Sequence, residues 1–299
     1  MTNTFPMTMI AQIDNVAVFQ TAAFLHDDID DSAAKNQRTG FEGQSNYGEL
    51  NLGLHVNDNA LQVLDNRMNL LAAINNLLAA INEQLTDKSA QNEQHEAINR
   101  LHWVSQVHGK HIHDVDATTL NMAPLSADAM VSQQNGRGLA IMTADCVPIV
   151  LYQPTSGKIA AIHAGWQGLA CGVIQETVNR FTDSGPIQAW IGVCISQENY
   201  EVNTDVRDKL LSGCIANQTL SQAHIDNFVS LFSISSYDDK IKLDLPKLAA
   251  MQLEAAGATV MNDLPVDCSY ADTHYYSYRR QTHMQQPATG RMALVIVRR

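Results

Sequence analysis

The stretch GLAIMTADCVPIVLYQPTSGKIAAIHAGW, residues 138–166, contains three short apolar runs separated by turn residues. GLAIMT, VPIVLY and KIAAIHA are each long enough for a buried strand, and Asp, Pro, Ser and Gly stand between them. LHWVSQV and ADAMVS, which precede this stretch, have the same character and extend a central sheet. The segments IDNVAVFQTAAF, AWIGVCI and RMALVIV predict further strands.

Helices are expected on either side of these strands. Between residues 61 and 81 the apolar positions recur at steps of three and four, which predicts one helical face made of Leu61, Leu64, Met68, Leu71, Ile74, Leu78 and Ile81. Residues 165–181 and 244–257 predict two more helices. Because the sequence has no internal repeat or Pro/Ser-rich linker, we expect one domain over residues 1–299, with a polar surface insertion around residues 25–37.

Composition excludes several classes of function. A formal net charge of -12 argues against a nucleic-acid partner, so any phosphate must meet a local cluster of arginines. The sequence offers no signal peptide and no apolar stretch long enough for a membrane span, which predicts a cytoplasmic protein without a membrane partner. Five cysteines without a CxxC pair indicate reduced thiols rather than a disulfide framework.

Three possible metal ligands lie where predicted strands end. They are His108 in SQVHG, Cys146 in TADCVP and His163 in IHAGW. Two imidazoles and a thiolate suit Zn²⁺, and three protein ligands leave a coordination position open, as in catalytic zinc sites. Their spacing has no metal-ligand rhythm, however, so spacing alone leaves structural histidines and a buried thiol as an alternative.

The order of these motifs resembles the YfiH or laccase-domain family, whose members are described as purine nucleoside phosphorylases and formerly as multicopper polyphenol oxidases. The similarity starts at RTGFEGQSNYGELNLGLHVND, residues 38–58, and continues through SQVHG, ADAMVS, TADCVPIVL, HAGWQGLACGVI and YYSYRR. The resemblance implies an α+β fold, an α/β/β/α sandwich with two sheets packed between helices. It also implies a zinc site, with copper possible, made of His108, Cys146 and His163.

The resemblance further implies residues that contact the substrate. Asp145 would act as a general base or orient a substrate group, while Arg38 and Asn51 would offer a guanidinium for phosphate and an amide for the ribose or base. From YYSYRR, Tyr276 would present an aromatic face to a purine and Arg279 would contact phosphate. Each has a structural alternative, as a turn former, loop residue or core tyrosine. Many relatives also have arginine where this chain has Gln167.

These features predict an enzyme, a zinc-dependent purine nucleoside phosphorylase acting on adenosine, inosine and methylthioadenosine, with adenosine deaminase activity. Its partners would be a purine nucleoside and phosphate, and no protein partner is predicted. Copper-dependent polyphenol oxidation is one alternative. A multicopper site would need several H-x-H pairs, however, and the chain has a single one, His111 and His113. A Cys–His hydrolase or deamidase using Cys146 and His163 is the other, because a thiolate beside an imidazole serves both chemistries.

Overall fold

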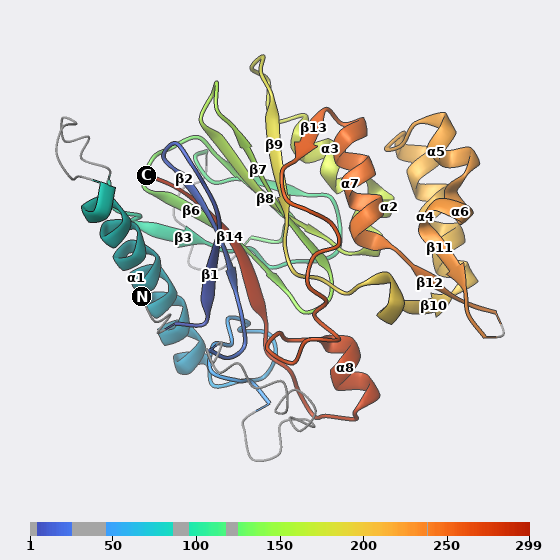
Figure 1. Cartoon of the computed structure of the whole chain (residues 1–299), viewed down its shortest axis with the longest axis horizontal. Helices are drawn as coiled ribbons and strands as arrows, with labels where there is room; N and C mark the ends of the chain where they lie inside the picture. Colours follow the sequence, from blue (N-terminus) through green and yellow to red (C-terminus); the bar gives the residue numbers. More distant parts are fainter. Residues whose placement is uncertain (1–4, 26–45, 86–95, 118–124, 238) are drawn as a thin grey trace.

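The computed structural model describes residues 5–25, 46–85, 96–117, 125–237 and 239–299. Two mixed β-sheets pack face to face, and helices cover the outer face of each (Figure 1). The predicted α+β sandwich is confirmed by this arrangement. Arg38 and residues 26–37 of the predicted surface insertion lie outside the described residues.

The first sheet has five strands and places the C-terminal strand at its centre. β14 pairs antiparallel with β2 on one side and with β6 on the other, while the short β3 runs parallel to β6. The order is β1 (Met7–Ile13), β2 (Val16–Thr21), β14 (Met292–Arg298), β6 (Arg137–Thr143) and β3 (Arg100–His102).

The second sheet has six strands and contains most of the expected central sheet. Its order is β13 (Ala258–Val260), β9 (Ile187–Ile191), β7 (Val147–Gln153), β8 (Lys158–Ala164), β5 (Ala129–Ser132) and β4 (Ile112–Asp114). The expectation of one central sheet is therefore wrong, since β3 and β6 belong to the other sheet. A small third sheet consists of β10 (Glu201–Asn203), β12 (Lys240–Leu243) and β11 (Ser233–Ser235).

A buried core fills the space between the two large sheets. Side chains alternate between the faces of a strand, so every second residue of β14 and β7 points into this core. Leu294 and Ile296 of β14 belong to the same apolar cluster as Val150 and Tyr152 of β7. The intervening residues of each strand pack outward against the helices, which explains why these strands are apolar on both faces.

Helix α1 (Ala60–Leu85) covers the outer face of the five-stranded sheet. The helix was predicted, but its predicted buried face is partly wrong because Leu61 and Met68 are 73% and 63% exposed. Its buried face starts instead at Val63 and continues through Leu70, Ile74 and Leu78. Hydrogen bonds explain the difference. Asn66 and Arg67 donate to the backbone carbonyls of residues 51 and 52, so that these polar residues, rather than Leu61 and Met68, face the protein at the start of the helix.

The outer face of the six-stranded sheet packs mainly against α2 (Trp166–Cys171), α3 (Val173–Val178) and α7 (Leu245–Ala255), with α4 (Thr204–Asn217), α5 (Gln222–Asp226) and α6 (Phe228–Phe232) beyond them. The helix expected over 165–181 is two helices, because Gly172 between them has a φ of 82°. Asp244 caps α7 by accepting the Lys247 N–H at 3.0 Å. No helix within the described ranges is both long and apolar enough to cross a bilayer.

Candidate metal centre

Cys146 lies where the chain crosses from one large sheet to the other. β6 of the five-stranded sheet ends at Thr143 and β7 of the six-stranded sheet begins at Val147, so three residues make the crossing. The tightness of the turn shows in Asp145, whose φ is 104°, a conformation that non-glycine residues rarely adopt. The Thr143 hydroxyl donates to the Cys146 carbonyl at 2.5 Å and helps to fix the turn.

His163 comes from β8, one residue before the end of the strand. It is 3% exposed and pairs in register with Pro148 of β7, two positions after Cys146. Its Nδ1 lies 2.9 Å from Oδ1 of the fully buried Asp128. This contact fixes the ring so that Nε2 is the atom available to a ligand, the orientation that a carboxylate gives to metal-binding histidines.

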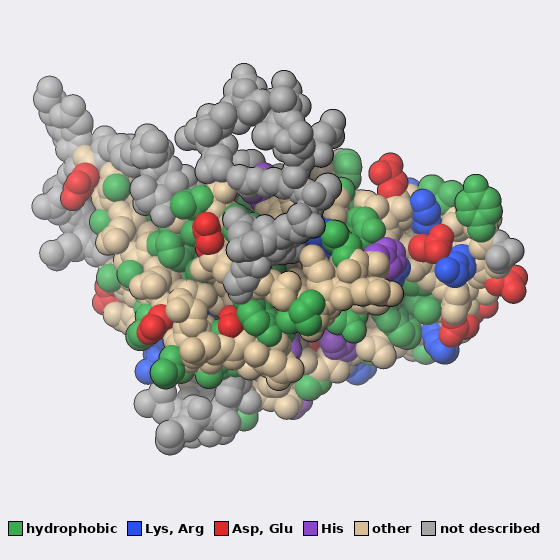
Figure 2. Space-filling view, turned by 90° about the horizontal axis from the view of Figure 1, so that it is seen from below, with side chains coloured by type: hydrophobic (Ala, Val, Ile, Leu, Met, Phe, Trp, Pro, Cys, Tyr) green, Lys and Arg blue, Asp and Glu red, His purple; other side chains and the backbone are tan. Residues whose placement is uncertain are grey.

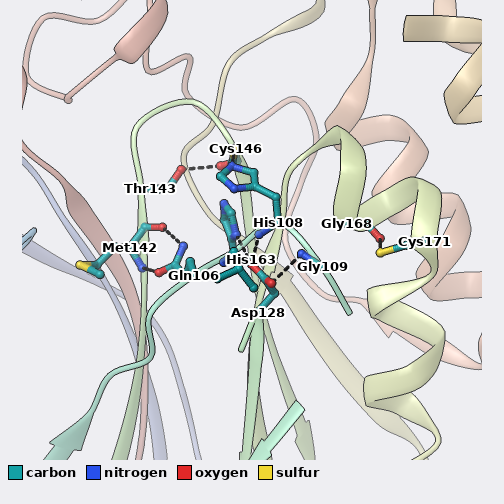
Figure 3. Close-up of polar contacts among 11 residues, drawn as sticks. Gln106, His108, Gly109, Asp128, Met142, Thr143, Cys146, His163, Gly168 and Cys171 are labelled. Carbon is teal, nitrogen blue, oxygen red and sulfur yellow. Dashed lines mark hydrogen bonds and ion pairs between the residues drawn. The ribbon is translucent and has the colours of Figure 1, made fainter. Parts of the chain in front are cut away.

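The same carboxylate of Asp128 also holds the loop that carries His108. Its Oδ1 accepts the His108 N–H at 2.8 Å, and its Oδ2 accepts the Gly109 N–H at 2.6 Å. The loop needs this support because His108 has a φ of 61°. Gln106 adds a second attachment, since its amide donates to the Met142 carbonyl at 2.7 Å and accepts the Met142 N–H at 2.9 Å (Figure 3).

The three predicted ligands converge. One ligand atom from each of His108, Cys146 and His163 lies within 4.8 Å of the other two (Figure 3). The Cys146 Sγ is 3.9 Å from His108 Nε2, and the two imidazole rings meet edge to face with centroids 4.7 Å apart. These separations are slightly wider than those around a tetrahedral zinc ion, so the group could hold a metal after a small contraction.

Gly165 leaves the room that these ligands need. A Cβ at this position would lie 3.0 Å from Cys146 Sγ and 3.2 Å from the His108 ring carbon Cδ2. Any larger residue would therefore push the thiol and the imidazole apart. The donor set and the absent side chain at residue 165 both fit a metal ion with nitrogen and sulfur ligands.

The electrostatics of the trio favour an ionised thiol. Burial raises the pKa of Cys146, but the positive charge of His163 and hydrogen bonds with His108 and His163 outweigh burial and lower this pKa to about 6. Burial lowers the pKa of His163, but the Cys146 thiolate and Asp128 together raise it to about 9. Both shifts arise largely from one attraction between thiolate and imidazolium, and a metal ion would take the place of the shared proton.

Asp145 is fixed next to the trio by two contacts with the C-terminal part of the chain. Its Oδ1 accepts the Ser269 hydroxyl at 2.7 Å, and its Oδ2 accepts the Arg279 N–H at 2.6 Å, in the first turn of α8 (Tyr278–His283). Arg279 itself turns its Nη1 to the Glu201 carbonyl at 2.6 Å, and its guanidinium lies 5.2 Å from the centre of the Tyr200 ring. The structure therefore places Asp145 beside the trio and the Arg279 backbone against Asp145, while the Arg279 guanidinium is bonded to a different segment.

Asn51 and Tyr276 are held inside the protein. The Asn51 amide oxygen accepts the N–H groups of Gly53 and Arg291, both at 2.9 Å, and its nitrogen donates to Asp58 at 2.8 Å. Tyr276 is fully buried, and its hydroxyl donates to the Tyr47 carbonyl. Neither side chain presents a free face or group to a substrate in this structure. Tyr278 is the exposed tyrosine of this segment, at 58%.

Two residues that support the site were not expected from the sequence. Asp128 and Gln106 were missed from the sequence, although an acid inside the apolar run ADAMVS was a signal for a buried carboxylate with partners.

The histidines of the H-x-H pair lie on and before a strand: His113 is on β4 and His111 precedes it. Among the residues that the structure describes, His108, Cys146 and His163 form the one group of three or more possible metal ligands. Seen from below in Figure 2, histidine side chains reach the surface at the end where α8 lies.

This chain is similar to known proteins along most of its length. Residues 32–299 match the family model described as multi-copper polyphenol oxidoreductase laccase. A purine nucleoside phosphorylase of Pseudomonas aeruginosa is 31% identical over 88% of this chain and 92% of its own length. The purine nucleoside phosphorylase YfiH of Escherichia coli is 32% identical over 89% and 93%, respectively.

A solved structure supports the fold. The Bacillus licheniformis hypothetical protein YfiH superposes with a TM-score of 0.70 at 23% identity, covering 99% of this chain and 98% of that one. The motifs, the fold and the extent of these matches give one answer. This chain belongs to the YfiH, or laccase-domain, family.

Proposed function

We propose that this protein is a zinc-dependent purine nucleoside phosphorylase that acts on adenosine, inosine and methylthioadenosine and also deaminates adenosine. The observation that carries the proposal is the convergence of His108, Cys146 and His163 within 4.8 Å, with the carboxylate of Asp145 fixed beside them. The names of the relatives from Pseudomonas aeruginosa and Escherichia coli support the phosphorylase activity.

His108, Cys146 and His163 would hold the metal. Zinc bound there would supply Lewis-acid chemistry next to the reacting atoms. Asp128 keeps the His163 ring and the His108 loop in position, so that the ligand atoms need little rearrangement. Asp145 has both oxygens oriented by Ser269 and Arg279, and its remaining lone pairs can accept a proton or a hydrogen bond from a substrate group.

Two reactions would share this site. In phosphorolysis a phosphate oxygen attacks the anomeric carbon, the bond from that carbon to the purine nitrogen breaks, and the protonated base leaves with ribose 1-phosphate as the other product. In deamination water adds to C6 of adenosine, and ammonia leaves to give inosine. Tyr278, exposed at the start of α8, is available as an aromatic surface for the base.

Product analysis tests the proposal directly. Adenosine is incubated with the protein in the presence and absence of phosphate, and the products are separated by chromatography. We expect adenine and ribose 1-phosphate only with phosphate, inosine with or without phosphate, and hypoxanthine when inosine is cleaved in turn. Cys146→Ala is the control and should lose these activities. Formation of none of these products by metal-loaded wild-type protein would reject the proposal.

A Cys–His hydrolase is the second candidate, and the Cys146–His163–Asp128 arrangement favours it. A thiolate, an imidazole and an orienting carboxylate are the groups of a cysteine hydrolase. This candidate requires protein that carries no stoichiometric metal as purified and still hydrolyses its substrate. The phosphorylase proposal requires about one zinc per chain, with Cys146 protected from alkylation by the metal.

The pH dependence of alkylation measures the thiol itself. In protein treated with a chelator, the lowered pKa of Cys146 means that the thiolate is half formed near pH 6. We therefore expect the iodoacetamide rate to rise up to about pH 7 and to stay nearly flat from pH 7 to 9. An ordinary thiol, with a pKa of about 8.5, would instead react roughly 25-fold faster at pH 9 than at pH 7. Mass spectrometry locates the modified cysteine.

A further inference from the structure

Arg67 lies near the start of α1 and packs its guanidinium against residues from three other segments. Its Nε and Nη2 donate to the Leu52 carbonyl at 2.9 and 2.7 Å, and Nη2 also lies 3.5 Å from the Met142 sulfur. The guanidinium carbon is 4.2 Å from the centre of the Trp103 ring. These contacts leave Nη1 without a hydrogen-bond acceptor among the described residues.

Arg291 comes from the other end of the chain and approaches the same segment. Its backbone N–H donates to Asn51, and its stem crosses Gly53 so closely that a Cβ there would lie 2.8 Å from the Arg291 Cγ. Nη1 donates to the carbonyls of Gly290 and Thr289 at 3.0 and 3.3 Å. Within the part of the chain that the structure describes, Nε and Nη2 have no acceptor.

Neutral groups accept the hydrogen bonds of both arginines in the part of the chain that the structure describes. Their acceptors are carbonyls and a thioether, and neither arginine is paired with a carboxylate among the described residues. Burial lowers the pKa of both, while the negative charges of Cys146 and Asp145 act in the opposite direction on Arg291. Arg291 directly precedes Met292, which pairs with Thr143, three residues before Cys146. The positive charges of both arginines also lower the pKa of His55 beyond the effect of burial.

Two partly buried guanidinium groups with no ion-pair partner among the described residues favour the binding of an anion. Holding such charges away from water is costly unless they are paired, and the chain as a whole carries a net charge of -12. A local cationic pair in an anionic protein concentrates a small anion there. Guanidinium groups with free N–H donors match the oxygens of a phosphate.

We infer that Arg67 and Arg291 form the subsite for a phosphate dianion beside the metal centre. The inference rests on the proposed phosphorylase function, and it assigns phosphate to two residues outside the set expected from the sequence. The two residues would also be the local group of arginines that phosphate binding needs in a chain with a net charge of -12. Residues 51–53 contact the Arg67 guanidinium and the backbone and stem of Arg291, so the Leu-Asn-x-Gly motif would act here by positioning both arginines.

Steady-state kinetics of inosine phosphorolysis test the role of each arginine. We expect Arg291→Gln to raise the KM for phosphate by about tenfold or more, with the KM for inosine changed less than about twofold. Arg67→Lys keeps the positive charge but loses the bidentate guanidinium. We expect this variant to fold normally and to show a smaller rise in the KM for phosphate. The matched control is Arg137→Gln, at the opposite end of β6 from the metal centre.

Binding is measured separately by the thermal stability of the metal-loaded protein. Inorganic phosphate should raise the melting temperature of wild type and of Arg137→Gln, and raise it much less in Arg291→Gln. Sodium chloride at matched ionic strength controls for screening. Inosine 5′-monophosphate distinguishes a free phosphate from the phosphate group of a nucleotide, and we expect it to stabilise the protein no more than inosine plus phosphate.

The outcomes separate the subsite from the enzyme activity. Wild-type protein that binds phosphate through Arg291 without cleaving inosine would reject the phosphorylase function and keep an anion site. An active wild type with an unchanged KM for phosphate in Arg291→Gln and Arg67→Lys would overturn the subsite. Stabilisation by the nucleotide alone, lost in Arg291→Gln, would overturn free phosphate as its ligand.

Discussion

The metal centre and the neighbouring segment around Asn51 and Tyr276 use polar side chains in opposite ways. At the metal centre Asp128 fixes the His163 ring through Nδ1 and the His108 loop through its backbone N–H, and each histidine offers a ring nitrogen to a ligand. At Asn51 and Tyr276 the polar atoms are bonded within the protein. A family motif can therefore contain residues that contact a ligand and residues that only hold other residues in position. The motif alone does not tell the two apart.

Removal of the Asp128 carboxylate should give the largest effect, because both histidines depend on it. In Asp128→Asn an amide nitrogen replaces one acceptor of the His108 or Gly109 N–H groups, and the charge facing His163 is lost. We expect a loss of about 3–5 kcal/mol in the free energy of unfolding. Zinc affinity should fall about 10- to 100-fold.

Denaturant unfolding and a competitive zinc titration measure the two effects. Asp116→Asn, at a carboxylate that binds Ser132 far along the same sheet, is the matched control. Wild-type zinc affinity in Asp128→Asn would contradict the role given to this residue.

Asn51→Ala should come next: it should lower stability and, because Asn51 positions Arg291, raise the KM for phosphate, while the metal centre stays intact. The substitution leaves the Gly53 and Arg291 N–H groups without their acceptor, at a cost of about 1–3 kcal/mol for each buried group. Zinc content, measured by elemental analysis, should stay near wild type. If Asn51→Ala kept its stability and lost only its affinity for nucleoside, the amide would belong with the ligand-binding residues after all.

Gly165→Ala should instead affect zinc binding more than stability. The added methyl group would meet the Cys146 sulfur at 3.0 Å, so we expect at least about a tenfold loss of zinc affinity with little loss of stability without metal. Gly109→Ala is the matched control, since its Cβ would approach no atom closer than 3.5 Å. Equal zinc affinities for the two variants would argue against a crowded site.

Tyr276→Phe should have the smallest effect. It removes one buried hydroxyl that donates to the Tyr47 carbonyl, which predicts a loss of about 1 kcal/mol in unfolding free energy. The KM for inosine should not change, whereas Tyr278→Ala should raise it because Tyr278 is exposed and directly precedes Arg279, whose N–H binds Asp145. The opposite result would place the purine at Tyr276.

The fold could be predicted in part. Apolar runs marked β5 to β8 correctly, but strands that are apolar on both faces do not show which sheet they join, so β6 was misplaced. Steps of three and four predicted α1, yet its buried face depends on Asn66 and Arg67 reaching carbonyls of a distant segment. The assignment of residues 1–299 to one catalytic domain and the cytoplasmic location stay predictions.

The candidate site could be predicted where strand ends carry its chemistry. His108, Cys146 and His163 follow from that rule together with the family resemblance. Arg67 and Arg291 could not, because a helix arginine and a residue before the last strand meet only after the chain folds. Side chains without a local pattern become visible only through their long-range contacts.

The attachment of the His108 loop to Asp128 has a consequence for assembly. The β7–β8 hairpin brings His163 and Cys146 together within one sheet, whereas His108 joins them only when its loop is anchored on Asp128. The complete ligand set should therefore form only after this loop has docked, and the rate of zinc uptake during refolding would report that step. Excess zinc should in turn shift the folding equilibrium toward the closed sandwich by mass action.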